Sequence, residues 1–208
     1  MGAISTTDAP PLSGPVAAAT DERIRTAALA CIARTGITRT TVDDVVREAG
    51  VSRATLYRAF PGGKEVLVEA VLGREVHRFF VELAGELARH QDAEGLLVAG
   101  IGRALRFLTE HPALRAVLDH EPGLLLSRVA FHRLGPILDA AAAFAAPHLR
   151  PHVRPDHPAP DDAATEVAEL LVRVVLTHAL EPSPHVDPTD DDSIARFVRR
   201  HLLPALTA

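Results

Sequence analysis

The stretch GVSRATLYRAFPGGK, residues 50–64, constrains the fold more than any other part of the chain. It begins with Gly50, which follows one apolar-periodic stretch, and it closes with Pro61-Gly62-Gly63, which interrupts the next one. Glycine adopts the left-handed backbone conformation that a tight turn between two helices needs, and Ser52 is a favourable helix N-cap. The pattern predicts a short helix over about 52–60, joined to the preceding helix by a tight turn, which is a helix-turn-helix arrangement.

Two further helices are expected on the N-terminal side of this turn. Thr20 or Asp21 can cap the first, and Gly36 can end it. Thr41 opens the second, with Asp44 three residues later in a variant of the capping box. Apolar residues recur with helical spacing in both: Ile24, Ala27, Ala28, Cys31 and Ile32 in the first, and Val42, Val45, Val46 and Ala49 in the second.

The remaining chain continues the helical pattern and shows no convincing strand alternation. We expect helices over about 64–90, 93–111, 112–120, 122–147 with a kink at Pro136, 164–180 and 190–206, with a Pro- and His-rich loop over 147–162. The predicted fold is all-α with about nine helices. It divides into a disordered tail over 1–19, a helix-turn-helix domain over 20–66 and a second helical domain over 67–208.

Composition narrows the class of protein. The 208 residues suffice to bury a core, and 47% apolar with 24% charged residues is typical of a soluble globular chain. The single Cys31 excludes an internal disulfide, which suits a reducing cytoplasm. No run reaches the roughly 18 apolar residues that a membrane span needs, and the N-terminus lacks a secretory pattern. We therefore expect a cytoplasmic protein that does not associate with a membrane.

The net charge of −5 conceals an asymmetry along the chain. Residues 20–66 contain eight basic and six acidic residues, a balance of +2, so the remainder carries −5 − 2 = −7. A mildly basic segment on an acidic body is expected where one end meets an anion. The charge alone is also compatible with an ordinary solvated surface.

The side chains of residues 52–60 suit the major groove of DNA. Arg53 can donate two hydrogen bonds to guanine, Thr55 can bond a base or contact a thymine methyl group, and Ala54 allows close approach. Tyr57 can donate its hydroxyl to a phosphate. We expect eight DNA-binding residues: Thr41, Ser52, Arg53, Ala54, Thr55, Tyr57, Arg58 and Lys64.

Three of these residues have a second interpretation. Lys64 stands in the first turn of a helix, where a cation is unfavourable unless a phosphate also lies there. A plain solvated lysine is the alternative. Thr41 and Ser52 are sufficiently explained as helix caps, so their phosphate contacts are conjecture.

The segment TTVDDVVREAGVSRATLYRAFPGGKEVLVEAV resembles the DNA-binding signature of the tetracycline-repressor (TetR/AcrR) family of bacterial transcription regulators. The residues that carry the resemblance are Gly50-Val51-Ser52, Thr55-Leu56-Tyr57, Phe60 and Lys64-Glu65. Pro61-Gly62-Gly63 departs from the polar turn that is more usual in this family. The resemblance covers about 47 residues. It implies a homodimer that binds a palindromic double-stranded DNA operator in the role of repressor and is released by a small-molecule effector.

The second domain offers candidates for two further roles. The helices over 164–180 and 190–206 are too apolar for the surface of a monomer. Two apolar stripes run along 164–180, one of which needs a partner, so we expect a dimer interface. Its candidates are Val167, Leu171, Val172, Val175, Leu176, Ala179, Phe197 and Leu202. Coverage of both stripes within one chain is the alternative. A lipophilic effector is expected to contact Phe79, Phe80, Leu83, Arg103, Phe107, His120, Glu121, Phe131 and His132.

Other classes of function find less support in the sequence. His148, His152 and His157 fall in a Pro-rich stretch without a cysteine or carboxylate cluster, so we expect no metal site. No hydrolase, phosphate-loop, zinc-protease or C-x-x-C motif is present, and we expect neither a cofactor nor enzymatic activity. A helical small-molecule-binding or protein-interaction module without DNA binding is the alternative to a regulator.

Overall fold

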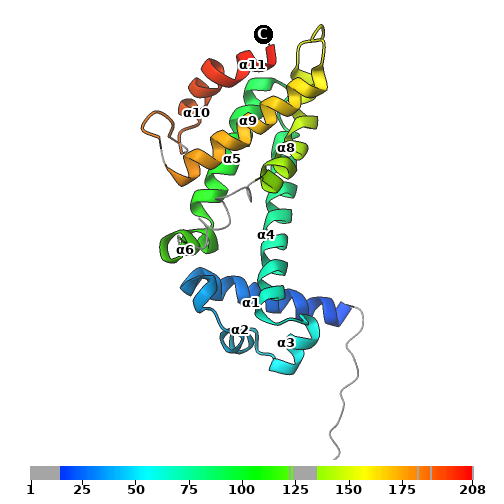
Figure 1. The fold of residues 1–208 in the computed structure, drawn as a ribbon, viewed down its shortest axis with the longest axis vertical. Helices are drawn as coiled ribbons and strands as arrows, with labels where there is room; N and C mark the ends of the chain where they lie inside the picture. The colour runs from blue at the N-terminus through cyan, green and yellow to red at the C-terminus, as the bar shows by residue number, and fades with distance from the viewer. Residues whose placement is uncertain (1–14, 122, 124–134, 182, 188, 208) are drawn as a thin grey trace, which may run out of the picture. The chain divides into compact units, whose positions relative to one another are not determined.

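The first helix of the chain is longer than its sequence pattern predicts. In the computed structural model, which describes residues 15–121, 123, 135–181, 183–187 and 189–207, α1 spans Pro15–Arg39 (Figure 1). Residues 15–19 were expected to be disordered, and this expectation is wrong. Pro15 is pre-organised for a first helical position and alanines follow it, so the helix starts before Thr20. The hydroxyl of Thr20 donates to the carbonyl of Val16 and caps nothing. Gly36, with φ 81°, was expected to end the helix but kinks it instead, and α1 continues to Arg39.

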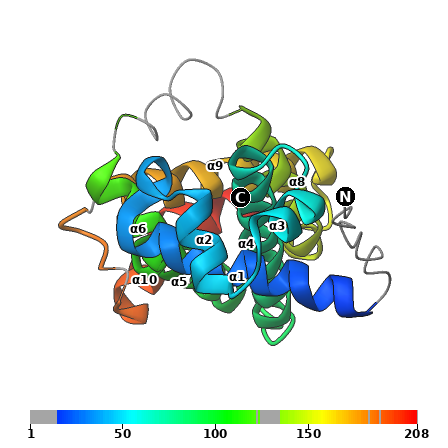
Figure 2. The same cartoon turned by 90° about the horizontal axis from the view of Figure 1, so that it is seen from below.

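The capping signals of the next two helices are confirmed. α2 spans Val42–Ala49, and Thr41 and Asp44 form its capping box. Gly50 ends α2 in the left-handed conformation with φ 62°. Ser52 then caps α3, Arg53–Ala59, by accepting a hydrogen bond from the backbone N–H of Thr55. The three helices and the start of α4 are seen together from below in Figure 2.

The fourth helix, α4, spans Lys64–Leu87 and belongs to two compact units of the chain. The first unit is Met1–Gly73 and the second is Arg74–Ala208. The first unit thus extends seven residues beyond the boundary expected at residue 66, 73 against 66. The reason is burial, because the first turns of α4 complete the small core of the first unit. That core contains Ile24, Ala28, Cys31, Ile32, Val45, Ala49, Leu56, Phe60, Leu67, Val68 and Val71.

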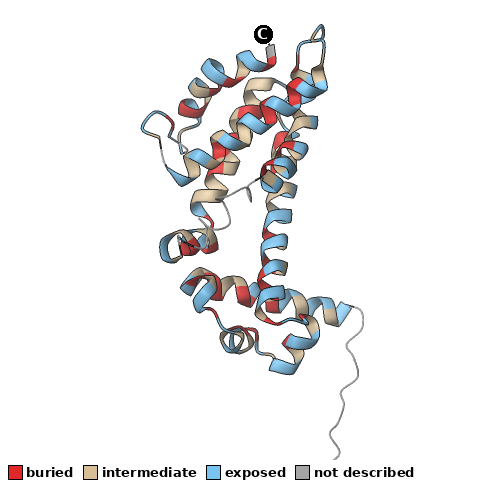
Figure 3. Ribbon diagram, viewed as in Figure 1, coloured by how far each residue is buried: buried red, intermediate tan, exposed pale blue. Residues whose placement is uncertain are grey.

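The second unit is built around α5 and α9. Its further elements are α5 Ala93–Glu110, α6 Pro112–His120, α8 Gly135–Leu149, η1 Arg150–His152, α9 Pro160–Leu180, α10 Asp191–Phe197, η2 Val198–Leu202 and α11 Leu203–Thr207. α8 packs along α9, and α5 contacts α6, α9 and α10. The buried positions, red in Figure 3, lie where these helices face one another. The most buried include Leu97, Ile101, Leu105, Ala168, Ile194 and Val198.

The long helix expected over 122–147 is only partly described, because 122 and 124–134 lie outside the described residues. The structure describes α8 from Gly135 on, so residues 124–134, before the kink expected at Pro136, lie outside the described part of the chain. Apart from this, every described element is helical or loop, and the all-α prediction is confirmed.

Candidate functional site

Buried apolar side chains on its opposite side hold the exposed side of α3 in place. Leu56 is fully buried and Phe60 is 3% exposed, so the apolar side of this seven-residue helix is fixed in the core of the first unit. The remaining side chains face outward. Arg53, Ala54 and Arg58 are exposed, and Tyr57 is 50% exposed. These residues form a polar surface of α3 with a tyrosine beside two arginines.

Arg53 is oriented by an acidic residue of the preceding helix. Its Nε donates to Oδ1 of Asp43 at 2.5 Å, and its Nη2 donates to Oδ2 of the same carboxylate. The hydrogen bond from Arg53 lowers the pKa of Asp43 below its ordinary value. Both side chains are more than half exposed, so solvent screens the pair and its main effect is to orient the guanidinium. Sequence reasoning missed Asp43, although its place in the first turn of α2 was visible.

Tyr57 packs against the turn that follows α3. Gly62 has φ 113° and Gly63 has φ 68°, both in the region that favours glycine. A Cβ at Gly63 would lie 3.0 Å from Cε1 of Tyr57. The Pro-Gly-Gly turn therefore brings the backbone close under the tyrosine ring and leaves the phenol half exposed.

Lys64 has a protein partner. Its Nζ donates to the backbone carbonyl of Thr38 at 2.8 Å, near the end of α1. The unfavourable position of this cation at the start of α4 is thus compensated by a helix-terminal carbonyl. An ammonium has three donors, so this bond leaves others for an anion. Neither the solvated nor the phosphate-binding interpretation included this contact.

The hydroxyl groups at the helix starts are engaged locally. Thr41 donates to Oδ2 of Asp44 at 2.6 Å and accepts from its backbone N–H. Ser52 lies 2.9 Å from the hydroxyl of Thr55 and caps α3. The capping interpretation of Thr41 and Ser52 accounts for both residues.

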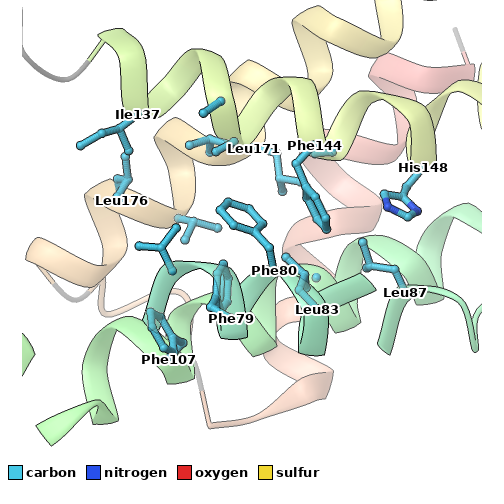
Figure 4. A pocket seen from close by; sticks show the side chains of 18 of the residues that line it. Phe79, Phe80, Leu83, Leu87, Phe107, Ile137, Phe144, His148, Leu171 and Leu176 are labelled. Carbon is cyan, nitrogen blue, oxygen red and sulfur yellow. The ribbon is translucent and has the colours of Figure 1, made fainter. Parts of the chain in front are cut away.

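The second unit encloses an apolar cavity of about 420 Å³ between α4, α5, α8 and α9. A row of aromatic contacts follows it (Figure 4). Phe107 stacks on Phe79 with ring centroids 4.5 Å apart, Phe79 is 5.2 Å from Phe80, and Phe80 is 4.6 Å from Phe144. Phe144 in turn contacts the imidazole of His148 at 5.3 Å.

The predicted ligand residues divide into three groups. Phe79, Phe80, Leu83 and Phe107 line the cavity together. Arg103 does not, because its guanidinium forms an ion pair with Glu82 on another surface of the unit. His120 is the exposed last residue of α6 and Glu121 is its C-cap, and neither lines the cavity. Phe131 and His132 lie outside the described residues.

The residues expected at a dimer interface are buried or partly buried in the second unit. Val167, Val175 and Leu202 are buried in its core, and Ala179 and Phe197 pack against that core. Leu171, Val172, Val175 and Leu176 line the cavity. Both apolar stripes of α9 are thus partly covered within the unit, while Leu170 is 44% exposed, and the dimer interface stays a prediction. The exposed side of α9 carries Glu166, Glu169, Leu170, Arg173 and Thr177.

The sequence interpretation missed the contribution of α8 to the cavity. Ile137, Ala141, Phe144 and His148 all line it, and Leu171 and Leu176 face them from α9. The spacing of Phe144 and His148, four residues apart on one helix, was the available signal.

His148, His152 and His157 do not converge. His148 faces the cavity, His152 ends η1, and Nδ1 of His157 accepts a hydrogen bond from the backbone of Ala159. Within the described part of the chain, no three His, Cys, Asp or Glu side chains are grouped to hold a metal ion. In the same residues no helix is long and apolar enough to cross a membrane.

Comparison with known proteins assigns the first unit. The sequence model described as "Bacterial regulatory proteins, tetR family" matches residues 24–71. The HTH-type transcriptional regulators SrpR and TtgW, both of Pseudomonas putida, are each 35% identical over 80 residues. These matches cover 38% of this chain, with 37% of SrpR and 59% of TtgW, so the chain spans only part of the length of these curated relatives.

The fold of the whole chain has relatives among solved structures. The TetR family repressor AlkX from a Dietzia species, implicated in biodegradation of n-alkanes, is 25% identical with a TM-score of 0.61. The match covers 89% of this chain and 94% of AlkX. The capped helices α2 and α3, joined by the turn at Gly50, form a helix-turn-helix, and an all-helical unit follows it. Residues 24–71 thus match the TetR family, and the fold of the whole chain is similar to that of a TetR family repressor.

Proposed function

We propose that the chain is a cytoplasmic transcription regulator that binds a palindromic DNA operator as a homodimer. We further propose that it represses its target and is released by a small lipophilic ligand. The observation that supports this most strongly is the exposed side of α3, which presents Arg53, Ala54, Tyr57 and Arg58 from a helix whose other side is buried. The family of residues 24–71 supports the same function.

Base reading is assigned to Arg53. A guanidinium donates two parallel hydrogen bonds to a carboxylate or to O6 and N7 of guanine. Asp43 occupies these donors in the free protein, so DNA must replace the carboxylate with a base. Tyr57 and Arg58 lie on the same helix as Arg53 and are assigned to phosphates. Lys64 is assigned to a phosphate as well, through the donors that its bond to Thr38 leaves free.

The homodimer is proposed to form through the exposed sides of α8 and α9. Leu170 is 44% exposed on α9, and Ala143 is exposed on α8, where a small side chain allows helices to approach closely. A two-fold dimer places its reading helices about one DNA turn apart, roughly 34–36 Å, which requires a palindromic operator. Sedimentation of wild type and Leu170→Arg tests this interface, with a shift toward monomer expected for the variant.

Release by a ligand is proposed to follow from occupancy of the cavity in the second unit. A ligand shifts a conformational equilibrium only by the difference in its affinity for the two states. A compound that fits the cavity in the form with low DNA affinity would therefore lower the occupancy of the operator. Equal DNA binding with and without a compound that demonstrably fills the cavity would remove this part of the proposal.

The function is tested by selecting bound duplexes from a random DNA pool with the purified full chain at low salt. Enrichment of one palindrome is expected, with an affinity that falls steeply as salt rises. A binding module that does not contact DNA would instead enrich no sequence at any salt concentration.

A further inference from the structure

The cavity of the second unit has one polar position. Of the described residues that line it, His148 alone has a hydrogen-bonding side chain, and the others are aliphatic, aromatic, proline or glycine. Arg103 of α5 pairs with Glu82 of α4 and does not line the cavity. A ligand in this cavity therefore meets apolar surface along its length and a single hydrogen-bonding group.

That group lies at one end. His148 lies beside Leu87, whereas Ile137 and Leu176 lie at the opposite end (Figure 4). His148 and Ile137 are eleven residues apart on α8, 148 − 137, which corresponds to about 16 Å of helix. The cavity is thus long, with the imidazole of His148 at one end, Ile137 and Leu176 at the other, and the row of aromatic rings between the two ends.

The imidazole is available to a ligand. Its ring is held against Phe144, and no described residue forms a hydrogen bond with Nδ1 or Nε2. The nearest cationic side chain in sequence, Arg150, is engaged by Asp161. An imidazole nitrogen can donate to a carboxylate or hydroxyl oxygen, and in an apolar cavity an oxygen left without a partner costs free energy.

We propose that this cavity binds a medium-chain aliphatic compound with one oxygen-bearing head group, and that His148 receives the head group. A cavity of 420 Å³ at about 30 Å³ per non-hydrogen atom holds about 14 such atoms, which is a chain of about ten to twelve carbons with its head group. This inference rests on the proposed function for its biological meaning, because the compound would be the effector. Its physical content concerns the second unit alone.

The test compares wild type with His148→Phe, which keeps a ring against Phe144 and removes the hydrogen bond. Sodium decanoate, 1-decanol and n-decane are the probes, followed by calorimetric titration or, for n-decane, by competition with decanoate. The variant is expected to bind at least one oxygen-bearing probe about tenfold more weakly, with no weakening for n-decane, because the chain contributes equally in both proteins.

Three further variants make the result specific. His185→Phe, at an exposed histidine away from the cavity, is expected to bind all probes as wild type does. Ala104→Phe places a ring in the cavity and is expected to abolish binding of all of them. If His148→Phe does not fold, judged by circular dichroism, His148→Leu replaces it.

The outcomes separate the claims. Failure of every probe to bind wild type, equal loss for n-decane and decanoate in His148→Phe, or no loss for either oxygen-bearing probe would each overturn the inference. Loss for decanoate alone identifies a carboxylate head group, and loss for decanol alone a hydroxyl. None of these titrations contains DNA, so a failure here leaves the DNA-binding proposal intact, and a protein that binds no duplex leaves the ligand result intact.

Discussion

The surface of α3 and the cavity of the second unit present opposite chemistry from equally regular helices. On α3 the polar side chains are outside, and the buried Leu56 and Phe60 only fix the helix. In the second unit the apolar side chains face a space of their own, and His148 is the polar exception among the described lining residues. A surface of charged donors suits a large anionic polymer, whereas an apolar cavity suits a small molecule. The core of the first unit must therefore hold α3 in place, whereas the core of the second unit must leave space for a ligand.

The largest effect is expected where the first unit depends on one buried side chain. Leu56→Ala should lower the free energy of unfolding by about 4 kcal/mol, because a fully buried leucine loses both its transfer energy and its packing. Chemical denaturation followed by circular dichroism measures the loss. Leu72→Ala, at a leucine that is 36% exposed, is the matched control and should cost below about 1 kcal/mol. Equal losses would show that α3 is not anchored through Leu56.

The second unit contains a buried ionic cluster away from the cavity. Glu75 is 4% exposed, its Oε2 lies 3.3 Å from Nε2 of His111 and 2.8 Å from Nη2 of Arg78, and its Oε1 accepts from Arg74. Burial opposes ionisation, but the hydrogen bonds from His111 and Arg74 and the arginine charges outweigh it, so the pKa of Glu75 is lowered. Glu75→Ala should cost about 3 kcal/mol, because it leaves the basic partners without their carboxylate.

The same cluster predicts how stability depends on pH. A carboxyl group whose pKa is lower in the folded protein stabilises the fold at pH above its unfolded value, about 4.3, and that contribution is lost as pH falls through the folded pKa. Unfolding free energies of wild type and Glu75→Gln, measured from neutral pH down to about pH 3, should converge as the pH falls. A constant difference across this range would contradict the assignment.

A smaller effect is expected at the turn after α3. Gly63→Ala should cost about 2 kcal/mol, because an alanine with φ 68° is strained and its Cβ would meet the Tyr57 ring at 3.0 Å. Gly73→Ala is the matched control, since nothing lies within 4 Å of its added Cβ in the middle of α4. That variant should be unchanged or stabilised by up to about 1 kcal/mol. Thermal unfolding of both proteins separates a strained turn from a general intolerance of alanine.

The smallest effect on stability is expected for Asp43→Asn. Both partners of the Arg53 pair are exposed and screened by solvent, so the free energy of unfolding should stay close to that of wild type. Affinity for duplexes of unrelated sequence should nevertheless rise several-fold, because a negative charge is lost and Arg53 is released. Fluorescence anisotropy at fixed salt measures this affinity, and Glu22→Gln on α1 is the charge-matched control. A rise of the same size in both variants would reduce the role of Asp43 to net charge.

The first unit was largely predictable because its signals are local. Thr41 with Asp44, Gly50 and Ser52 each act within a few residues, and each was found in the predicted place. The partners of the functional side chains were not predictable, because the Arg53–Asp43 and Lys64–Thr38 contacts join residues 10 and 26 positions apart.

The second unit was predictable as helices but not as a site. The four helices around its cavity come from segments far apart in sequence, and periodicity does not distinguish an apolar side chain that faces a cavity from one that faces a partner. Leu171, Val172 and Leu176 were therefore assigned to an interface, and His148 was assigned to a loop although it lies in the last turn of α8.

The central claim is that α3 reads DNA through Arg53 while the second unit does not contact bases. The most direct test measures the dissociation constants of wild type, Arg53→Ala and Arg115→Ala, an exposed arginine of α6, for the selected palindrome and for a scrambled duplex at the same salt. We expect Arg53→Ala to lose about ten- to a hundredfold in affinity for the palindrome, with a much smaller loss for the scrambled duplex, and Arg115→Ala to match wild type. Equal losses on both duplexes for Arg53→Ala, or equal behaviour of the two variants, would contradict the account.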